Sequence, residues 1–370
     1  MAHKHKVRKK NVKQESAKRV VPYLPSTPYK MSTSFSALPI VSLSVLSSPT
    51  AKDEALLALS SRLDEVFATT GFAYLTDLPL TFSHDDVFEL CANFFGPSGL
   101  SESEKMKLAK NTFVAENKNT YRGYFPPQLG ADNLKEGFEI GSPTTRAATT
   151  LSPLTGRKFN LTEPNVFPVT RPLLRSHCET LHSELQSLAT RILTLLAVAL
   201  GKPPSFFDNY LTDSLSTLRL LHYPPVPTIR TQKLICTPHT DSGILTLLHQ
   251  DKTGGLEVLN SKGDWIAAPY VPGSVVVNIG DLMAMVSGGR WVATYHRVRA
   301  VKHQDPATGR YSVPFFFEPG LHCVVKGVEG EEVVYGEHVL KKMKGWVEFQ
   351  EALKDIPDIK TIGRQAMEAH

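Results

Sequence analysis

After residue 214 the chain is a succession of short apolar runs separated by Gly, Pro, Asn and Asp. Runs of this length at close intervals predict strands of a β-sandwich or barrel, because each strand needs a facing sheet to bury its apolar side. The runs lie at 218–223, 244–249, 255–259, 265–268, 274–279, 296–301 and 311–317. This pattern constrains the C-terminal half to a β-core.

Helical spacing of apolar residues dominates the first half instead. A short strand pattern at 38–43 is followed by helical patterns at 55–67, 84–95, 101–109 and 172–200, with a strand at 71–75 between the first two. Gly201 and Pro203 end the longest pattern. A further helix is expected at 336–353 to close against the β-core. We therefore predict a mainly β fold with a helical N-terminal half (α+β).

The net charge of +5 is unevenly distributed along the 370 residues. Residues 1–20 hold eight basic residues and one acidic residue, whereas the rest of the chain holds 33 basic and 35 acidic residues. The body is thus close to neutral, and we expect no nucleic acid to bind to it. The basic tail, expected to be disordered, is either a nuclear address or simply solvated. Met31 offers an alternative start for a chain without it.

Localisation and redox state follow from two further features. No apolar run approaches the ~20 residues that a membrane span needs, and no signal-peptide pattern opens the chain. We expect a cytoplasmic protein with no membrane partner, or a nuclear one if the basic tail acts as an address. The four cysteines are far apart in sequence, which predicts free thiols rather than disulfides or a zinc site.

Three residues form a candidate metal site. His239 and Asp241 are two positions apart, so in an extended segment their side chains project to the same face. His296 follows at the head of a strand-like run. Two imidazoles and one carboxylate suit a divalent iron ion and leave coordination positions open, which favours catalysis over a structural role.

A second pair of residues suggests an anion site. Arg310 and Ser312 alternate along a predicted strand and so point to the same side, where they offer a guanidinium and a hydroxyl to one carboxylate. An inward-facing arginine needs such an anionic partner because an unpaired buried charge is costly. The alternative is an exposed turn residue after Thr308-Gly309.

These motifs together resemble the isopenicillin N synthase-like family of iron(II)/2-oxoglutarate-dependent dioxygenases. The resemblance covers about residues 38–350 and includes Gly71-Phe-Ala-Tyr and Lys135-Glu-Gly-Phe-Glu-Ile-Gly upstream of the β-core. Its main stretches are His239-Thr-Asp-Ser-Gly-Ile-Leu-Thr-Leu-Leu, Gly273-Ser-Val-Val-Val-Asn-Ile-Gly-Asp281, His296-Arg-Val and Arg310-Tyr-Ser-Val-Pro-Phe-Phe.

The resemblance implies a double-stranded β-helix, or jelly roll, flanked by helices. It implies that His239, Asp241 and His296 bind Fe(2+), and that these three residues are catalytic. Arg310, Ser312 and Tyr223 would bind 2-oxoglutarate, with O2 as cosubstrate and ascorbate as a reductant. Many relatives have Asn-Tyr-Tyr where this chain has Leu221-His222-Tyr223, so the contact of that Asn is absent or replaced.

The implied reaction couples decarboxylation of 2-oxoglutarate to hydroxylation, desaturation or cyclisation of a small organic molecule. Phe316 and Arg122 are the candidate substrate residues: the first occupies a position that often lines the pocket, and the second a region that closes over the site. The implied division is a tail at 1–34, a helical dioxygenase region at 35–213, a jelly-roll core at 214–322 and a closing segment at 323–370.

Several alternatives remain open. Some relatives are iron oxidases that do not use 2-oxoglutarate and keep the Arg-x-Ser pair for a substrate carboxylate. A zinc hydrolase also uses two histidines and an aspartate, and a jelly roll with a lapsed metal site would only bind its ligand. The basic tail alone suggests a nucleic-acid demethylase.

Overall fold

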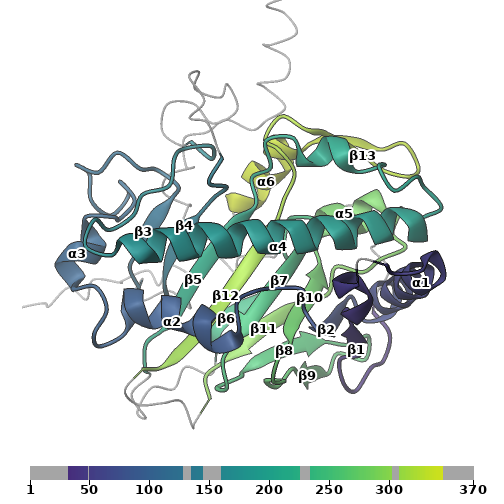
Figure 1. Ribbon diagram of the computed structural model, residues 1–370, viewed down its shortest axis with the longest axis horizontal. Coiled ribbons are helices and arrows are strands. Elements are labelled where there is room, and N and C mark those ends of the chain that lie inside the picture. Colours follow the sequence, from purple (N-terminus) through teal and green to yellow (C-terminus); the bar gives the residue numbers. More distant parts are fainter. Residues whose placement is uncertain are drawn as a thin grey trace, which may run out of the picture.

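The computed structural model describes residues 32–48, 50–127, 135–144, 160–225, 234–301 and 308–344. Two β-sheets face each other and helices cover one of them (Figure 1). The major sheet has the strand order β1 (Ile40–Ser42), β2 (Phe72–Thr76), β10 (Val275–Ile279), β7 (Leu245–Gln250), β12 (Arg310–Phe317), β5 (Thr217–Tyr223), β4 (Glu136–Ile140) and β3 (Gly123–Phe125). Its neighbours are antiparallel except β1 and β2.

The minor sheet is smaller and carries part of the candidate metal site. Its order is β6 (Leu234–His239), β11 (His296–Arg299), β8 (Leu256–Leu259) and β9 (Trp265–Ala267). A separate hairpin is formed by β13 (Val324–Lys326) and β14 (Glu332–Val334).

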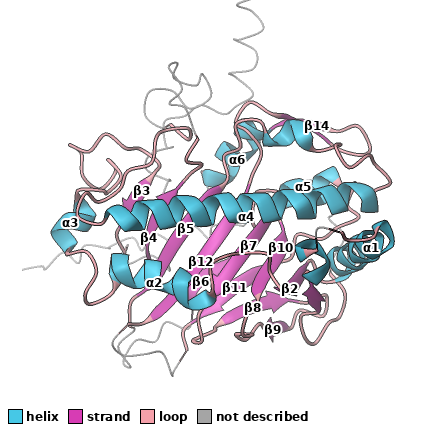
Figure 2. Cartoon of the chain, viewed as in Figure 1, coloured by secondary structure: helices cyan, strands magenta, loops and turns pink. Residues whose placement is uncertain are grey.

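Helices pack on the outer face of the major sheet, which is the face turned away from the minor sheet (Figure 2). The long helix α4 crosses the strands of this sheet, with α1 and α2 beside it (Figure 1). The helices are α1 (Asp53–Thr69), α2 (His84–Phe95), α3 (Glu102–Met106), α4 (Pro172–Ala199), α5 (Asp281–Val286) and α6 (Tyr335–Met343), with 3-10 turns η1 (Ser44–Ser47) and η3 (Asp208–Leu211). None of the described helices is both long and apolar enough to span a lipid bilayer.

Strand alternation divides the major sheet into two functional faces. In β12 the side chains of Tyr311, Val313, Phe315 and Phe317 belong to the main hydrophobic core beneath the helices. Because successive side chains point to opposite faces, Arg310, Ser312 and Phe316 lie on the inner face, toward the minor sheet. One strand therefore supplies both the core and the candidate site.

The N-terminal half is not purely helical, because it contributes β1–β4 to the major sheet. Strands from both sides of residue 214 thus share one sheet. The sequence patterns also omitted β6, β13, β14 and the short helix α5. In β4 every residue is buried, including two glutamates, so neither alternation nor an apolar run marks the strand. The predicted helix at 336–353 is observed as α6 as far as Met343, and its part beyond residue 344 lies outside the described residues.

The cysteines are free thiols, as predicted. Cys91 and Cys178 are buried, while Cys236 and Cys323 are partly exposed. Burial raises the pKa of the Cys178 thiol above its ordinary value, so this sulfur is un-ionised at neutral pH.

Candidate active site

The three predicted metal ligands converge between the sheets. His239 ends β6 and His296 begins β11, and the two are directly paired across the minor sheet. Asp241 Oδ1 lies 3.8 Å from His239 Nε2 and 3.7 Å from His296 Nε2. One ligand atom from each residue can be chosen so that all lie within 4.8 Å of one another. Such spacings fit a single ion bound at about 2.0–2.2 Å by each atom.

Hydrogen bonds orient each ligand toward the common centre. The Nδ1 atoms of His239 and His296 donate to the carbonyls of Thr237 (2.8 Å) and Thr294 (3.2 Å), which leaves both Nε2 atoms facing Asp241. Asp241 Oδ2 accepts hydrogen bonds from Thr246 Oγ1 (2.6 Å) and Asn278 Nδ2 (2.8 Å). Its other oxygen, Oδ1, is thereby directed at the imidazoles.

Two of the three ligands, His296 and Asp241, have the protonation states that a metal requires. Burial, together with the charge of His239, lowers the pKa of His296 to about 4, so this imidazole is neutral at pH 7. Burial alone would raise the pKa of Asp241, but its histidine neighbours and the hydrogen bonds from Thr246 and Asn278 lower it overall. A neutral imidazole and an ionised carboxylate are the ligand forms that a divalent ion requires.

The hydrogen bond from Thr246 supports a first prediction. Thr246→Val removes one of the two donors that hold Asp241 Oδ2 while keeping the shape of the side chain. Loss of such an outer partner is expected to weaken iron(II) binding by about 10- to 100-fold, measured by competition with a chelator. Thr190→Val makes the same exchange on α4 and should leave the affinity unchanged. Equal affinities in the two variants would contradict this role for Thr246.

Arg310 lies buried on the inner face at the start of β12. Its side chain is 1% exposed, its Nε donates to the carbonyl of Gly254 (2.7 Å), and its guanidinium lies 4.8 Å from the ring centre of Tyr223. The Nη1 atom has no hydrogen-bond partner among the described residues. Gly254 has a φ of +71°, a conformation that favours glycine and turns its carbonyl toward the arginine.

The register explains why Tyr223 and Ser312 accompany this arginine. Arg310 is paired with Tyr223 on β5, and Ser312 lies between Leu221 on β5 and Gln250 on β7. Ser312 and Tyr223 are buried, with 2% and 3% exposure. The amide oxygen of Gln250 also lacks a partner among the described residues. The predicted anion-binding residues are thus brought together as a buried, polar recess.

The two predicted substrate residues occupy different positions. Phe316 lies partly exposed on the inner face of β12, opposite Thr246 on β7 and Thr217 on β5. Arg122 directly precedes β3 and is 2% exposed; its Nη1 donates to Thr217 Oγ1 (2.8 Å). Arg122 is therefore a buried side chain beside the inner wall, in the bend that leads into β3. Their contact with substrate stays a prediction.

Sequence reasoning missed further charged residues on this wall. Glu139 on β4 is paired with Arg219 on β5 and accepts hydrogen bonds from Arg219 and from Lys110. The side chains of Lys110, Glu139 and Arg219 are 3%, 0% and 12% exposed. A detectable signal existed in Leu218-Arg-Leu-Leu, where strand alternation places Arg219 opposite to the core leucines.

Glu318 continues the inner face beyond Phe316 and has an unusual ionisation. Its carboxylate accepts a hydrogen bond from Tyr335 (2.6 Å). Burial raises its pKa from 4.5 to about 7, although Tyr335 and the charges of Arg122 and Arg219 act in the opposite direction and the charge of Asp241 adds to the rise. At neutral pH this acid is therefore close to half protonated.

The raised pKa of Glu318 predicts a pH-dependent stability. Between pH 4.5 and about 7 the folded protein binds more protons at this group than the unfolded chain does, so its contribution to stability falls as pH rises. The total change is on the order of 3 kcal/mol. Urea unfolding at pH 5 and pH 8 should therefore show that Glu318→Gln gains stability relative to the wild type at the higher pH. An equal difference at both pH values would count against the raised pKa.

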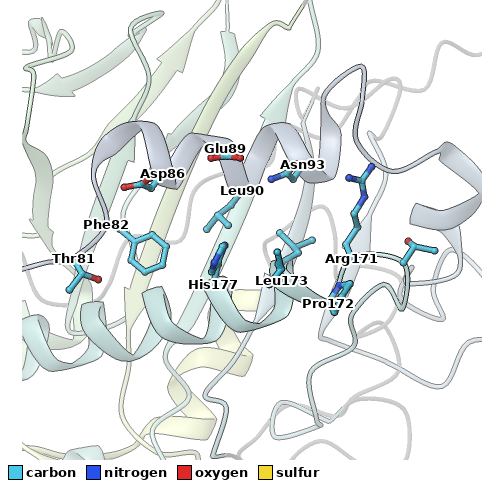
Figure 3. A pocket seen from close by; sticks show the side chains of 12 residues that line it. Thr81, Phe82, Asp86, Glu89, Leu90, Asn93, Arg171, Pro172, Leu173 and His177 are labelled. Carbon is cyan, nitrogen blue, oxygen red and sulfur yellow. The ribbon is translucent and has the colours of Figure 1, made fainter.

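A surface cavity of about 610 Å³ lies away from this site, between α2 and α4. Leu90, Leu173 and His177 point into the space between the two helices (Figure 3). Because these helices cover the outer face of the major sheet, the sheet separates the cavity from the metal ligands. The cavity is therefore assigned no part in the chemistry at those ligands.

Comparisons with known proteins agree with this geometry. Residues 214–319 match the profile of the 2OG-Fe(II) oxygenase superfamily, and residues 38–169 match the profile described as non-haem dioxygenase in morphine synthesis N-terminal. Homoarginine-6-hydroxylase 2-ODD-233 of Oryza sativa subsp. japonica is 31% identical over 339 residues, covering 85% of this chain and 98% of that enzyme. The 2-oxoglutarate-Fe(II) type oxidoreductase hxnY of Emericella nidulans is 37% identical over 253 residues, covering 65% and 68%.

A solved structure extends the similarity to the fold. The crystal structure of a full-length Neurospora crassa protein in complex with alpha-KG has a TM-score of 0.69 and 26% identity, covering 85% of this chain and 98% of that one. A second structure of the same Neurospora protein contains alpha-KG and 5-formyluracil, with the same score and identity. These proteins share a large antiparallel sheet with helices.

Proposed function

The chain belongs to the 2OG-Fe(II) oxygenase superfamily, and from this premise we propose how its own residues serve the reaction. The protein is a non-haem iron(II) dioxygenase that couples decarboxylation of 2-oxoglutarate to oxidation of a small organic molecule. We assign its two facing sheets to a double-stranded β-helix, with the reaction centre between them.

The metal is assigned to His239, Asp241 and His296. Two imidazole nitrogens and one carboxylate oxygen fit an iron(II) ion and leave three positions for exchangeable ligands. When bound there, iron(II) supplies the O2 chemistry that turns 2-oxoglutarate into succinate and CO2 and oxidises a C–H bond of the substrate. The role of the three residues is to hold the ion through orientations that Thr246, Asn278 and two backbone carbonyls fix in advance.

The cosubstrate is assigned to Arg310, Ser312 and Tyr223. The guanidinium of Arg310 would bind the distal carboxylate of 2-oxoglutarate, since a charge-assisted pair satisfies both the buried cation and the buried anion. The observation that carries this assignment is the unpartnered Nη1 of a side chain that is 1% exposed. The aromatic ring of Tyr223 keeps the guanidinium in place and excludes water from one of its faces.

The inner face of the major sheet would position the substrate near the metal ligands and exclude water from the reaction centre. Phe316, opposite Thr246 near the metal ligands, and Leu221, opposite Ser312 in the cosubstrate recess, supply apolar surface on this face. Excluding water protects the oxidising centre from side reactions. The names of the relatives refer to different small molecules, homoarginine among them, so the relatives support a small-molecule substrate without naming it.

The test is iron-dependent consumption of 2-oxoglutarate. Anaerobically iron-loaded protein is mixed with O2 and ascorbate, with and without 2-oxoglutarate, and succinate formation and O2 uptake are measured. We expect slow succinate formation without an added substrate and none without iron. If iron binds while 2-oxoglutarate neither binds nor is consumed, Arg310 serves a substrate carboxylate instead, and the protein is an oxidase of the same superfamily.

A further inference from the structure

A cluster of charged side chains lines the inner wall at the β3–β4–β5 end of the major sheet. We name it the inner charged cluster; it consists of Lys110, Arg122, Glu139 and Arg219. The mechanism proposed above uses none of these residues. Burying charges in a wall is costly unless they are paired or bind a ligand, so the cluster calls for an explanation.

Strand register places this cluster beside the reaction centre. Thr246, which binds Asp241, is directly opposite Phe316, and Phe316 is opposite Thr217. Arg122 donates to Thr217, and Arg219 follows Thr217 by two residues on the same face of β5. Two inter-strand steps of about 4.8 Å separate Thr246 from Thr217, a distance of roughly 10 Å. A small organic molecule can bridge this span.

Arg219 is held rigidly at the accessible end of the cluster. Its Nη2 donates to Glu139, whose other oxygen is bound by Lys110. Its guanidinium also lies 5.2 Å from the ring centre of Phe316 and 5.7 Å from that of Phe125. With 12% of its side chain exposed, against 3% for Lys110 and 0% for Glu139, Arg219 is the most accessible of these three residues.

Arg122 is the observation that points to a ligand. Its guanidinium packs 4.7 Å from the ring centre of Tyr121, and its hydrogen bonds go to the neutral oxygens of Thr217 and Leu161. Within the described part of the chain its Nε has no hydrogen-bond partner, and the carboxylates whose charges act on it, Glu139 and Glu318, lie beyond ion-pair distance. On the other side, a Cβ atom at Gly141 would come within 2.7 Å of the guanidinium, so glycine there makes room for it. The unpartnered Nε–H of this buried guanidinium leaves a hydrogen-bond position that an anionic ligand can fill.

Building on the proposed function, we propose that the substrate is a carboxylate-bearing small molecule whose carboxylate is bound by Arg219 and Arg122. Its reacting carbon would then lie toward Phe316 and the metal ligands. Glu139 and Lys110 act as positioning residues, because they fix the guanidinium of Arg219 without reaching the ligand. The distal carboxylate of 2-oxoglutarate is bound separately, at Arg310.

The experiment compares acids with their neutral counterparts. A panel of aliphatic, aromatic and amino-acid carboxylates, each paired with its primary amide, is titrated calorimetrically into anaerobic protein holding Fe(II) and saturating 2-oxoglutarate. At least one acid is expected to bind about 10- to 100-fold more tightly than its amide, as hydrogen bonds to a charged group allow. Arg219→Gln and Arg122→Gln should each lower the affinity for the acid by about tenfold or more and leave the affinity for the amide unchanged.

Three controls distinguish a specific loss of carboxylate binding from a general effect of the substitutions on the protein. Arg175→Gln, an exposed arginine on α4, should change neither affinity. Arg219→Lys keeps a positive charge and should restore part of the acid preference. The affinity for 2-oxoglutarate should be unchanged in every variant, which also shows that each one is folded. If the wild-type protein does not bind 2-oxoglutarate, the assignment of the cosubstrate to Arg310 is wrong, and that result says nothing against Arg219 and Arg122.

The proposal is overturned by any of three results. These are that no acid in the panel binds the wild type, that acids and amides bind equally, or that the preference for acids survives in both glutamine variants. If the variants fail to fold, the affinities of the wild-type protein for acids and for their amides still test whether the substrate site prefers a carboxylate, because that comparison requires no substitution.

Discussion

Asp241→Ala is expected to abolish iron binding and with it the formation of succinate. Asp241 is the single anionic ligand of the three, and its Oδ1 lies within 3.8 Å of the Nε2 atoms of both histidines. The loss should exceed the roughly 10- to 100-fold that removal of an outer partner costs, because a direct bond and the only negative charge among the ligands disappear together. Iron content after desalting and iron-dependent succinate formation measure the effect.

Two further variants make this result specific to the ligand. Asp241→Asn keeps the size of the side chain but not its charge, and should also lose most of the iron. Asp264→Ala, an exposed aspartate after β8, should retain both iron and activity. Full iron retention in Asp241→Ala would show that the histidines suffice, and the assignment of the carboxylate would be wrong.

Arg310→Ala is expected to raise the KM for 2-oxoglutarate by about 2 to 3.5 orders of magnitude. Leaving a buried carboxylate without its cation costs about 3–5 kcal/mol, and each 1.4 kcal/mol corresponds to about a tenfold change in affinity. Iron binding should be unaffected, because the side chain of Arg310 bonds to Gly254 and packs on Tyr223 rather than on the metal ligands. Succinate kinetics and anaerobic titration of 2-oxoglutarate are the measurements.

The matched control is Arg299→Ala, an exposed arginine on β11 that pairs with Glu257. It should leave the KM for 2-oxoglutarate unchanged. Arg310→Lys should recover only part of the affinity, since lysine keeps the charge but cannot form the planar, two-bonded contact. An unaltered KM in Arg310→Ala would mean that another cation of the inner wall binds 2-oxoglutarate, and Arg219 would be the first candidate.

Elements with strong local signals were predictable from the sequence. The helix expected at 84–95 is observed with these bounds, because Ser83 and Asp86 form a capping box and Gly96 follows its last residue. The runs at 218–223 and 311–317 begin one residue later than the observed strands β5 and β12 and end at the same residues. In both cases the apolar pattern and the ends of the element are encoded within a few neighbouring residues.

Features that depend on distant partners were not predictable in this way. β4 carries buried glutamates whose partners, Lys105, Lys110 and Arg219, come from other segments. β6 contains a proline and has few buried residues, so it resembles a loop until it is paired with β11. The metal ligands followed from residue type and spacing, whereas the supporting Thr246 and Asn278 depend on how β7 and β10 are aligned.

The division of β12 into two faces constrains how this enzyme can diverge. Inserting or deleting one residue within Arg310–Phe317 would exchange the faces, placing Tyr311 and Val313 in the recess and Arg310 in the hydrocarbon core. Fold and activity would be lost in one event. New substrate preferences must therefore arise by replacing inner side chains one at a time, with the length of this strand held constant.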